Sequence, residues 1–279
     1  MRTLFVSFIF MLLYTALPAQ NARPFVLGEI REMESKELGE KRTLNIYLPE
    51  GYAQNDSTKF HVIYLLDGSA DEDFIHVAGL VQFNTFPWIS RIPPSIVVGI
   101  ANTSRQRDFT YPTTIAADKK KFGNTGGSAA FISFIEKELQ PYIDSAYKTG
   151  NGKTLIGQSL GGLLATEILF KKPSLFNNYI VISPSLWWDD ASLLKLQPEI
   201  LTPGFKQPTG IYVGVGKEGA GLSAIPHIME QDVALLVKKL RTAKNKNLSV
   251  IHDYLPRENH ATIAHQALLN AFQLLWKNK

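Results

Sequence analysis

One serine, Ser159, stands among glycines in the stretch TLIGQSLGGLLA, which covers positions 154 to 165. Gly157 and Gly161 lie two residues to either side of it, and Gly162 follows directly. A glycine in a helix interior costs about 1 kcal/mol relative to alanine. The stretch therefore requires a backbone that larger residues cannot supply. A serine hydroxyl held in such a turn is a candidate nucleophile if the chain also offers a base to activate it.

The five residues from Gly157 to Gly161 fit G-x-S-x-G, the nucleophile elbow that joins a strand to a helix in α/β-hydrolases. The aliphatic residues before Ser159 predict a strand, and those after it predict a helix. The glycines would then leave room for the neighbouring strand and helix, and the new helix would point its first N–H groups at the reacting centre. The alternative is a turn in which Ser159 only caps the helix.

A base for this serine is expected late in the chain, because the order in this fold class is serine, acid, histidine. His260 follows the last predicted strand in the stretch LPRENHATIAHQAL and is the candidate base. His265 falls within the next helix, His252 within a strand, and His227 in a loop beside Pro226.

The acid is expected after the strand that precedes the last one. Glu218 follows the strand pattern of IYVGVG and could fix the tautomer of His260. Asp189, Asp190 and Asp232 are rivals. A serine–histidine dyad without an acid also stays open.

An oxyanion in such a site needs two N–H donors. The elbow supplies the N–H of Leu160, and the loop in LLDGSAD supplies the N–H of Ser69 as the second candidate. Gly68 permits an unusual backbone there, and Asp67 is alternatively a turn-forming residue.

Motifs for cofactors and metals are weak. The stretch GVGKEG at 214–219 matches the dinucleotide pattern G-x-G-x-x-G, but no helix pattern begins at its third glycine. No phosphate-binding G-x-x-x-x-G-K-[ST] occurs, and His260 and His265 miss the spacing of H-E-x-x-H. We therefore predict no cofactor and no metal.

The elements that would position these residues alternate along the chain. Two early strands, 25–34 and 42–48, predict an antiparallel hairpin at a sheet edge. Further strand patterns cover 60–66, 95–102, 153–157, 177–183, 209–216 and 248–255. Helix patterns cover 71–83, 127–147 with a kink or restart at Pro141, 159–172, 229–243 and 262–276. This predicts an α/β-hydrolase fold, with a mostly parallel central sheet covered by helices on both faces, in one domain spanning 21–279.

Composition narrows the function class. The 279 residues are 45% hydrophobic, and their net charge of +4 is scattered, which argues against nucleic-acid binding. The chain has no cysteine, which excludes disulfides, thiolate metal sites and a cysteine nucleophile.

The first 20 residues have the pattern of a signal peptide. Arg2 precedes an apolar run from Leu4 to Leu13, and small residues follow up to Ala19. The run is too short for a comfortable permanent span. We expect cleavage near Ala19 or Gln20, export to the periplasm or medium, and no stable membrane span afterwards.

With these residues in place, the sequence resembles the esterase D-like branch of the α/β-hydrolases, the "Putative esterase" family. The resemblance runs from about Leu44 to Trp276 and lies in VIYLLDG, IANTSRQRDFTYP, LIGQSLGGLLA, VISPSLWW and ENHATIAHQAL. Among members it is most similar to siderophore esterases of the enterobactin type. The family also contains feruloyl and acetyl xylan esterases and acyltransferases.

The resemblance implies a carboxylic-ester hydrolase that forms an acyl-enzyme on Ser159, with Glu218 and His260 as partners. It implies an oxyanion hole at Ser69 and Leu160 and a small-molecule ester as substrate. Arg105, in the family's R-x-R-D segment, would contact an anionic substrate or brace a loop. Trp187, or its neighbour Trp188, would line an acyl pocket or simply pack over the sheet edge. A carbohydrate-linked acyl esterase, an acyltransferase, and a catalytically silent binding protein are the alternatives.

Overall fold

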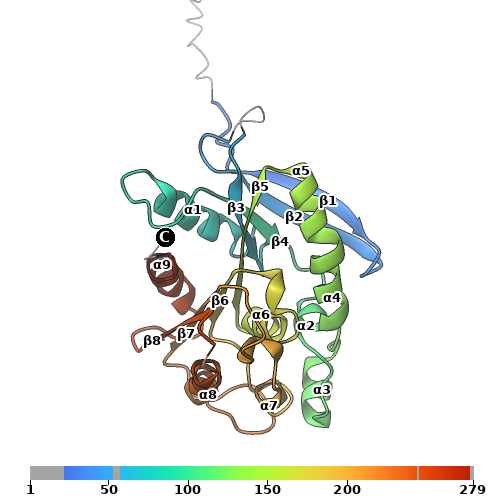
Figure 1. Ribbon diagram of the computed structural model, residues 1–279. Coiled ribbons are helices and arrows are strands. Elements are labelled where there is room, and N and C mark those ends of the chain that lie inside the picture. The colour runs from blue at the N-terminus through green and yellow to red at the C-terminus, as the bar shows by residue number, and fades with distance from the viewer. Residues whose placement is uncertain (1–21, 53–56, 244, 277–279) are drawn as a thin grey trace, which may run out of the picture.

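The computed structural model describes residues 22–52, 57–243 and 245–276, and the predicted signal peptide lies outside them. Eight strands form one sheet in the order β1-β2-β4-β3-β5-β6-β7-β8 (Figure 1). Their bounds are β1 Glu29–Ser35, β2 Glu40–Tyr47, β3 Phe60–Leu65, β4 Ser95–Ile100, β5 Thr149–Gln158, β6 Asn178–Ile182, β7 Thr209–Gly216 and β8 Leu248–Leu255. Six neighbouring strands of the sheet, in the order β4, β3, β5, β6, β7 and β8, run parallel to one another, as the alternating pattern predicts.

The early strands form the predicted antiparallel hairpin, and β2 also pairs antiparallel with β4. Gly39, with φ of 66°, supplies the left-handed residue of the connecting turn. β1 begins at Glu29, later than predicted, and Phe25 and Val26 are exposed instead of paired. The prediction began the strand too early because Phe25 and Val26 are apolar, and the sequence pattern does not distinguish an exposed apolar segment from a strand.

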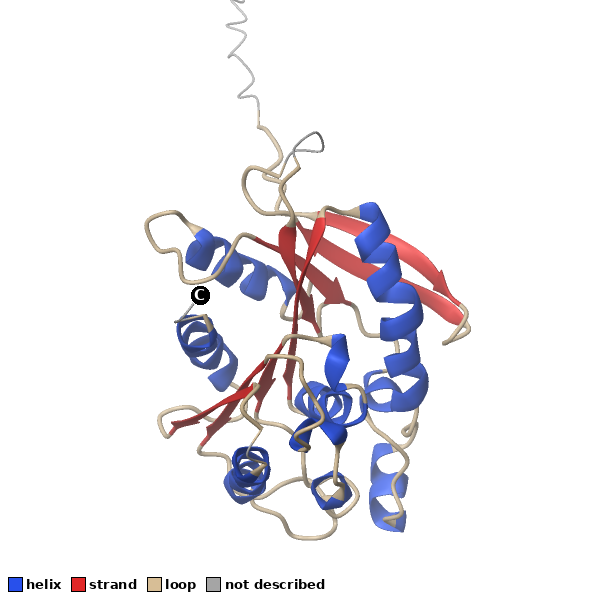
Figure 2. Ribbon diagram, viewed as in Figure 1, coloured by secondary structure: helices blue, strands red, loops and turns tan. Residues whose placement is uncertain are grey.

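Helices cover both faces of the sheet (Figure 2). α1 Phe74–Thr85 and α9 Ile263–Leu275 lie on one face. The other face carries α2 Arg105–Phe109, α4 Ser128–Phe134, α5 Gln140–Ala146, α6 Leu160–Lys171 and α8 Met229–Thr242. Two short helices, α3 Ala116–Phe122 and α7 Ser192–Lys195, lie in the long connections near the carboxyl ends of the strands.

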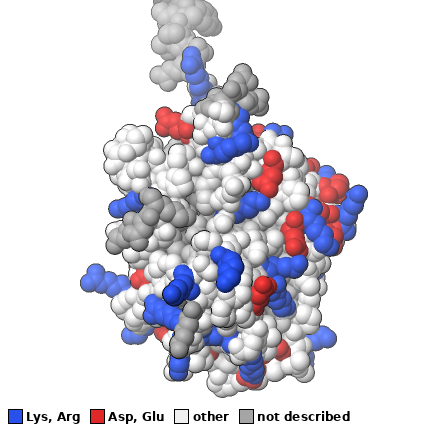
Figure 3. All heavy atoms as spheres, viewed as in Figure 1, with Lys and Arg blue, Asp and Glu red and all other residues white. Residues whose placement is uncertain are grey.

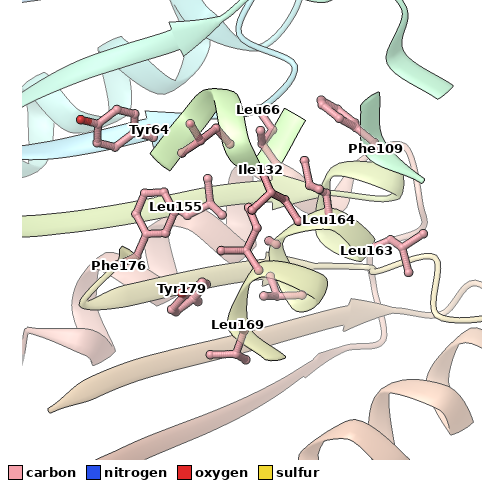
Figure 4. Packing of buried hydrophobic residues seen from close by; sticks show 14 of the residues in the cluster. Tyr64, Leu66, Phe109, Ile132, Leu155, Leu163, Leu164, Leu169, Phe176 and Tyr179 are labelled. Carbon is pink, nitrogen blue, oxygen red and sulfur yellow. The ribbon is translucent and has the colours of Figure 1, made fainter. Parts of the chain in front are cut away.

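The core divides at the sheet because successive strand residues point to opposite faces. Tyr64 and Leu155 face α6, while Ile63 and Ile156 face α1 and α9. Figure 4 shows the first of these layers, in which Leu163, Leu164 and Leu169 of α6 pack among aromatic side chains. The layers fix β5 and α6 relative to each other and hence the turn between them.

The helix around Pro141 restarts as predicted. A π-helical turn, Ile135–Leu139, separates α4 from α5, and Pro141 stands in the first turn of α5. Proline has no N–H and its ring crowds the carbonyl four residues earlier, so the backbone before it widens. α1 differs from its prediction: it begins at Phe74, after the acidic residues 71–73, and has no acidic side chain in its first turn.

The charged side chains are dispersed. On the face shown in Figure 3, Lys and Arg are spread widely, and Asp and Glu lie among them. Within the part of the chain that the structure describes, no helix is both long and apolar enough to cross a membrane.

Candidate active site

Ser159 sits in a sharp turn between β5 and α6, with φ of 60° and ψ of −120°. This left-handed backbone costs on the order of 1–3 kcal/mol for a non-glycine residue. A Cβ on Gly157 would lie 2.3 Å from the carbonyl oxygen of Gly161, and one on Gly162 would lie 2.9 Å from that of Ile182. Gly161 is less constrained, since its nearest neighbour would be Asp67 Oδ2 at 3.3 Å. Gly157 and Gly162 are therefore required because neighbouring backbone passes too close to leave room for a Cβ.

The structure brings Ser159, His260 and Glu218 into one hydrogen-bonded line, although they come from three different connections. His260 Nε2 lies 3.0 Å from Ser159 Oγ, and its Nδ1 lies 2.5 Å from Glu218 Oε2. The main-chain carbonyl of His260 accepts a hydrogen bond from Gln158 Nε2 at 2.6 Å. The His260 side chain is 47% exposed and that of Glu218 only 2%, so the base can meet a substrate while the acid is shielded from water.

Glu218 is held by more than the histidine. Ser183 Oγ and the N–H of Gly216 both donate to its Oε1, the latter at 3.0 Å. Its own N–H donates to Glu230 Oε1, in the first turn of α8, at 2.9 Å. Burial raises the pKa of Glu218, but the bonds from His260, Ser183 and Gly216 outweigh it, and the pKa lies below its usual value. The carboxylate form is thus the stable one.

The two expected oxyanion donors lie at the same edge of the sheet. The N–H of Leu160 is the first of α6 and has no acceptor within the helix. The N–H of Ser69 makes no hydrogen bond to another described residue. A Cβ on Gly68 would lie 2.4 Å from Gly99 Cα, so only glycine lets this loop pass so close to β4. Asp67 just before it adopts φ of 55°, as a turn-forming residue does.

Arg105 braces this loop. Its Nε donates to Asp67 Oδ1 at 2.6 Å and its Nη2 to Asp67 Oδ2 at 2.9 Å, a bidentate pair. Nη2 also reaches the carbonyl of Gln158 at 3.5 Å. The bracing function foreseen for Arg105 is thus visible in its contacts. Its side chain keeps 34% of its surface exposed.

A cavity of about 180 Å³ opens beside Ser159 and His260. Trp187 forms part of its wall, together with Met229 and Leu222. The indole of Trp187 stacks on Phe122 of α3, with ring centroids 5.6 Å apart. Trp188 does not line the cavity. It is fully buried and donates through Nε1 to the carbonyl of Tyr111 at 2.8 Å.

The rival acids are engaged elsewhere. Asp189 accepts hydrogen bonds from Thr113 and Thr114, while Asp190 and Asp232 both contact His227. Sequence reasoning missed Ser183 and Glu230, which hold Glu218. The only signal for Ser183 was its place at the end of a predicted strand.

The arrangement suits ester chemistry and offers no metal centre within the residues described. No group of three or more His, Asp or Glu side chains there could hold a metal ion. A hydroxyl, an imidazole and a carboxylate in line, beside free N–H donors at a helix N-terminus, are the parts that acyl transfer requires.

Comparison with known proteins agrees with this chemistry. The model of the family described as "Putative esterase" matches residues 35–268. The ferri-bacillibactin esterase BesA of Bacillus subtilis is 31% identical over 204 residues, which cover 68% of this chain and 70% of that protein.

Solved structures are similar over most of the chain. An IroE-like serine hydrolase from Shewanella oneidensis has a TM-score of 0.78 and 33% identity, covering 90% of this chain and 80% of its own. The BES protein from Bacillus cereus has a TM-score of 0.77 and 28% identity, covering 92% and 98%. The α/β-hydrolase fold is thereby confirmed, and the chain belongs to the Putative esterase family of ester hydrolases.

Proposed function

We propose that this chain is an exported serine esterase that hydrolyses siderophore-type esters through an acyl-enzyme on Ser159. The observation that carries the proposal is the hydrogen-bonded line from Ser159 through His260 to Glu218. The names of the relatives support the substrate class: one is a ferri-bacillibactin esterase and another, from Emericella nidulans, a siderophore enterobactin esterase.

In the first half of the reaction, Ser159 Oγ attacks the ester carbonyl carbon while His260 Nε2 takes the hydroxyl proton. The carbonyl π-electrons move onto oxygen, and the N–H groups of Leu160 and Ser69 stabilise that oxyanion. The intermediate collapses, the bond to the alkoxy oxygen breaks, and His260 returns its proton to the departing alcohol. The acyl group stays on Ser159 as an ester.

The second half repeats these steps with water as the nucleophile. His260 takes a proton from water, the hydroxide attacks the acyl carbonyl, and collapse releases the carboxylic acid and restores the Ser159 hydroxyl. Glu218 stays ionised throughout and stabilises the imidazolium form of His260. Arg105 holds the loop that carries Ser69 against the elbow, through Asp67 and Gln158.

Export is part of the proposal. The charged start, apolar run and small residues of the first 20 positions support a cleaved signal peptide, and residues 21–279 would form the mature single domain. Mass spectrometry of the mature protein tests this. A chain beginning at Gln20 or Asn21 is expected, and a mature protein that retains Met1 to Ala19 would contradict it.

The test of the activity is a substrate panel run with the wild type and Ser159→Ala. The panel holds an enterobactin-type trilactone, a feruloylated sugar, acetylated xylan and p-nitrophenyl butyrate. We expect the trilactone to have the highest kcat/KM, and Ser159→Ala to lower kcat on every substrate by roughly 10⁴-fold or more. Full turnover by Ser159→Ala would exclude the mechanism, and a preference for either carbohydrate ester would exclude the substrate class.

A further inference from the structure

Two histidines outside the catalytic line face each other from neighbouring helices. His76 is the third residue of α1, and His265 is the third residue of α9. His265 Nδ1 lies 3.3 Å from His76 Nε2, and the two ring centroids are 5.1 Å apart with their planes tilted by 42°. Both residues are exposed. Histidine is the commonest metal ligand among protein side chains, so a cation from solution meets two good ligands at one point.

The separation of the two nitrogens matches that of two ligands on one metal ion. A tetrahedral zinc ion binds an imidazole nitrogen at about 2.1 Å, which places two such nitrogens about 3.4 Å apart. An N–H donor usually lies closer to its acceptor, at about 2.9–3.0 Å. The observed 3.3 Å therefore fits two ligands of a shared ion better than it fits a hydrogen bond between the rings.

The core holds both helices in position. The residues next to the pair are buried in one layer of the core, on the same face of the sheet: Phe74, Val77, Ile263 and Ala267. α1 and α9 are neighbours on that face (Figure 1). Ligands carried on packed helices are positioned more precisely than ligands on loops. Only side-chain torsions therefore have to adjust for both imidazoles to reach one ion.

Acidic groups at the start of α1 favour a cation near the pair. Asp73 stands one turn before His76. Burial and the charge of Asp67 raise the pKa of Asp73, and the charge of His76 is among the effects that oppose this rise. The carboxyl of Asp73 thus lies within electrostatic reach of the imidazole. Asp67 is already paired with Arg105, whereas Asp73 and Glu72 add two acidic groups to this end of the helix.

The number of protein ligands sets the strength of such a site. In the part of the chain that the structure describes, no third His, Asp or Glu completes a group with the two histidines, so water would fill the other positions. Structural zinc sites have four protein ligands. With two of the four, a Kd of about 1–100 µM is expected. Imidazole nitrogens suit zinc, nickel and copper, whereas magnesium and calcium prefer oxygen ligands.

We propose that His76 and His265 form a binding site for one divalent transition-metal ion of the zinc, nickel and copper class, which ties the first turn of α1 to the first turn of α9. These helices begin shortly after the loops that carry Ser69 and His260. The ion would therefore link two segments that border the catalytic residues. The site is separate from the catalytic line and does not depend on the proposed esterase function.

Calorimetric titration with ZnCl₂ tests the site. We expect the wild type to bind one more zinc ion than His76→Gln/His265→Gln, with a Kd of about 1–100 µM for that ion. Each single variant should weaken this step by roughly 100-fold or more, since the loss of a partner that only orients a metal ligand already costs about 10- to 100-fold. The matched control is His252→Gln, an exposed histidine of β8, which should bind zinc as the wild type does. MgCl₂ should give no binding at this site.

Thermal unfolding measures the link between the helices. At a zinc concentration of about ten times Kd, the Tm of the wild type should rise by roughly 3 °C or more relative to the metal-free protein. The double variant should lose this rise, and MgCl₂ should produce none. Without metal, both single variants should hydrolyse p-nitrophenyl butyrate within about threefold of the wild-type rate, which establishes that their active site is intact.

The outcomes separate this inference from the proposed function. Equal zinc binding by the wild type and the double variant would overturn the metal site, and so would a rise in Tm that survives both substitutions. An equal loss of binding in His252→Gln would also overturn it, because zinc would then bind exposed histidines without selection. Ser159→Ala should keep the zinc site while losing turnover, so failure of the metal site leaves the esterase mechanism standing, and failure of the mechanism leaves the metal site standing.

Discussion

Two histidines in the loops that follow the parallel strands each contact a carboxylate, but their surroundings differ. His260 has Glu218 on one nitrogen and the hydroxyl of Ser159 on the other. His227 has a carboxylate on both sides, with Nδ1 3.2 Å from Asp232 Oδ1 and Nε2 3.4 Å from Asp190 Oδ1. The side chain of His260 is 47% exposed and that of His227 only 14%.

The difference separates a histidine arranged for proton transfer from one arranged for structure. A general base needs one nitrogen held by an acceptor and the other free to take a proton from the nucleophile. Both nitrogens of His227 are instead occupied by carboxylates. His227 links the loop of 219–228 to α8 and to the connection that contains Asp190. A histidine–carboxylate pair alone therefore does not indicate catalysis.

Removing the base should have the largest effect on activity. His260→Ala is expected to lower kcat by roughly 10⁴- to 10⁶-fold, as loss of a triad base does, because no other imidazole of the described residues contacts Ser159. Hydrolysis of p-nitrophenyl butyrate measures the loss. His227→Ala is the matched control and should keep kcat within about threefold; equal losses in the two variants would contradict the distinction.

The second-largest loss of activity is expected from changing Glu218, the carboxylate that contacts His260 Nδ1. Glu218→Gln keeps the size of the side chain but removes the charge that stabilises the imidazolium, and we expect a loss of roughly 10³- to 10⁴-fold in kcat. The matched control is Glu199→Gln, an exposed carboxylate remote from the site. Activity near the wild type in Glu218→Gln would instead support a serine–histidine dyad.

The sequence was informative where a single local rule applies. The runs of 60–66 and 95–102 predicted β3 and β4 almost to the residue, because strands buried on both faces are continuously apolar. The elbow followed from its glycines, and the meeting of Glu218 with His260 followed from chain order. Each of these predictions depends only on the residues next to a position in the sequence, or on where that position falls relative to the predicted strands.

Contacts between segments that are far apart in the sequence could not be predicted in this way. Arg105 pairs with Asp67, 38 residues away, and no spacing rule selects that partner over a substrate. The wall of the cavity depends on α3, whose sequence AADKKKF has too few apolar residues to predict a helix. Ser183 lies fully buried with φ of 43°, and its bond to Glu218 appears only when the ends of β6 and β7 are side by side.

The hydroxyl of Ser183 donates a hydrogen bond to Glu218, the carboxylate that contacts His260. Its hydrogen bond helps to hold the pKa of Glu218 below the usual value, so Ser183→Ala should raise that pKa. Glu218 then takes up a proton at higher pH, and the acidic limb of kcat/KM should shift upward, with a loss of roughly tenfold or less at neutral pH.

The pH profile of Ser183→Ala distinguishes tuning from a general structural defect. A variant that is merely less stable would lose activity evenly across the profile. The matched control is Ser145→Ala, whose hydroxyl bonds only to the carbonyl of Tyr142 and which should follow the wild-type curve. An unshifted profile in Ser183→Ala would mean that the hydroxyl does not tune Glu218.

The smallest effect on activity and the clearest on stability should come from His227→Ala. Burial raises the pKa of the Asp232 carboxyl, and the contact with His227 counters only part of that rise. Without the imidazole, the buried Asp232 is left without its partner, which costs about 1–3 kcal/mol of unfolding free energy at neutral pH. A carboxyl whose folded pKa lies above its unfolded value of about 3.9 destabilises the fold as pH rises through that range and costs nothing once protonated.

The destabilisation of His227→Ala should therefore be largest at neutral pH and shrink as the pH falls and Asp232 takes up a proton in the folded protein. Denaturant unfolding of both proteins at pH 7, 5.5 and 4 measures the difference. Asp232→Asn and the double variant His227→Ala/Asp232→Asn both lack the carboxylate, so the difference in stability between these two variants should not change with pH through Asp232. A difference that stays constant over this range in the single variant would mean that His227 supports the loop by packing alone and that its contact with Asp232 contributes nothing.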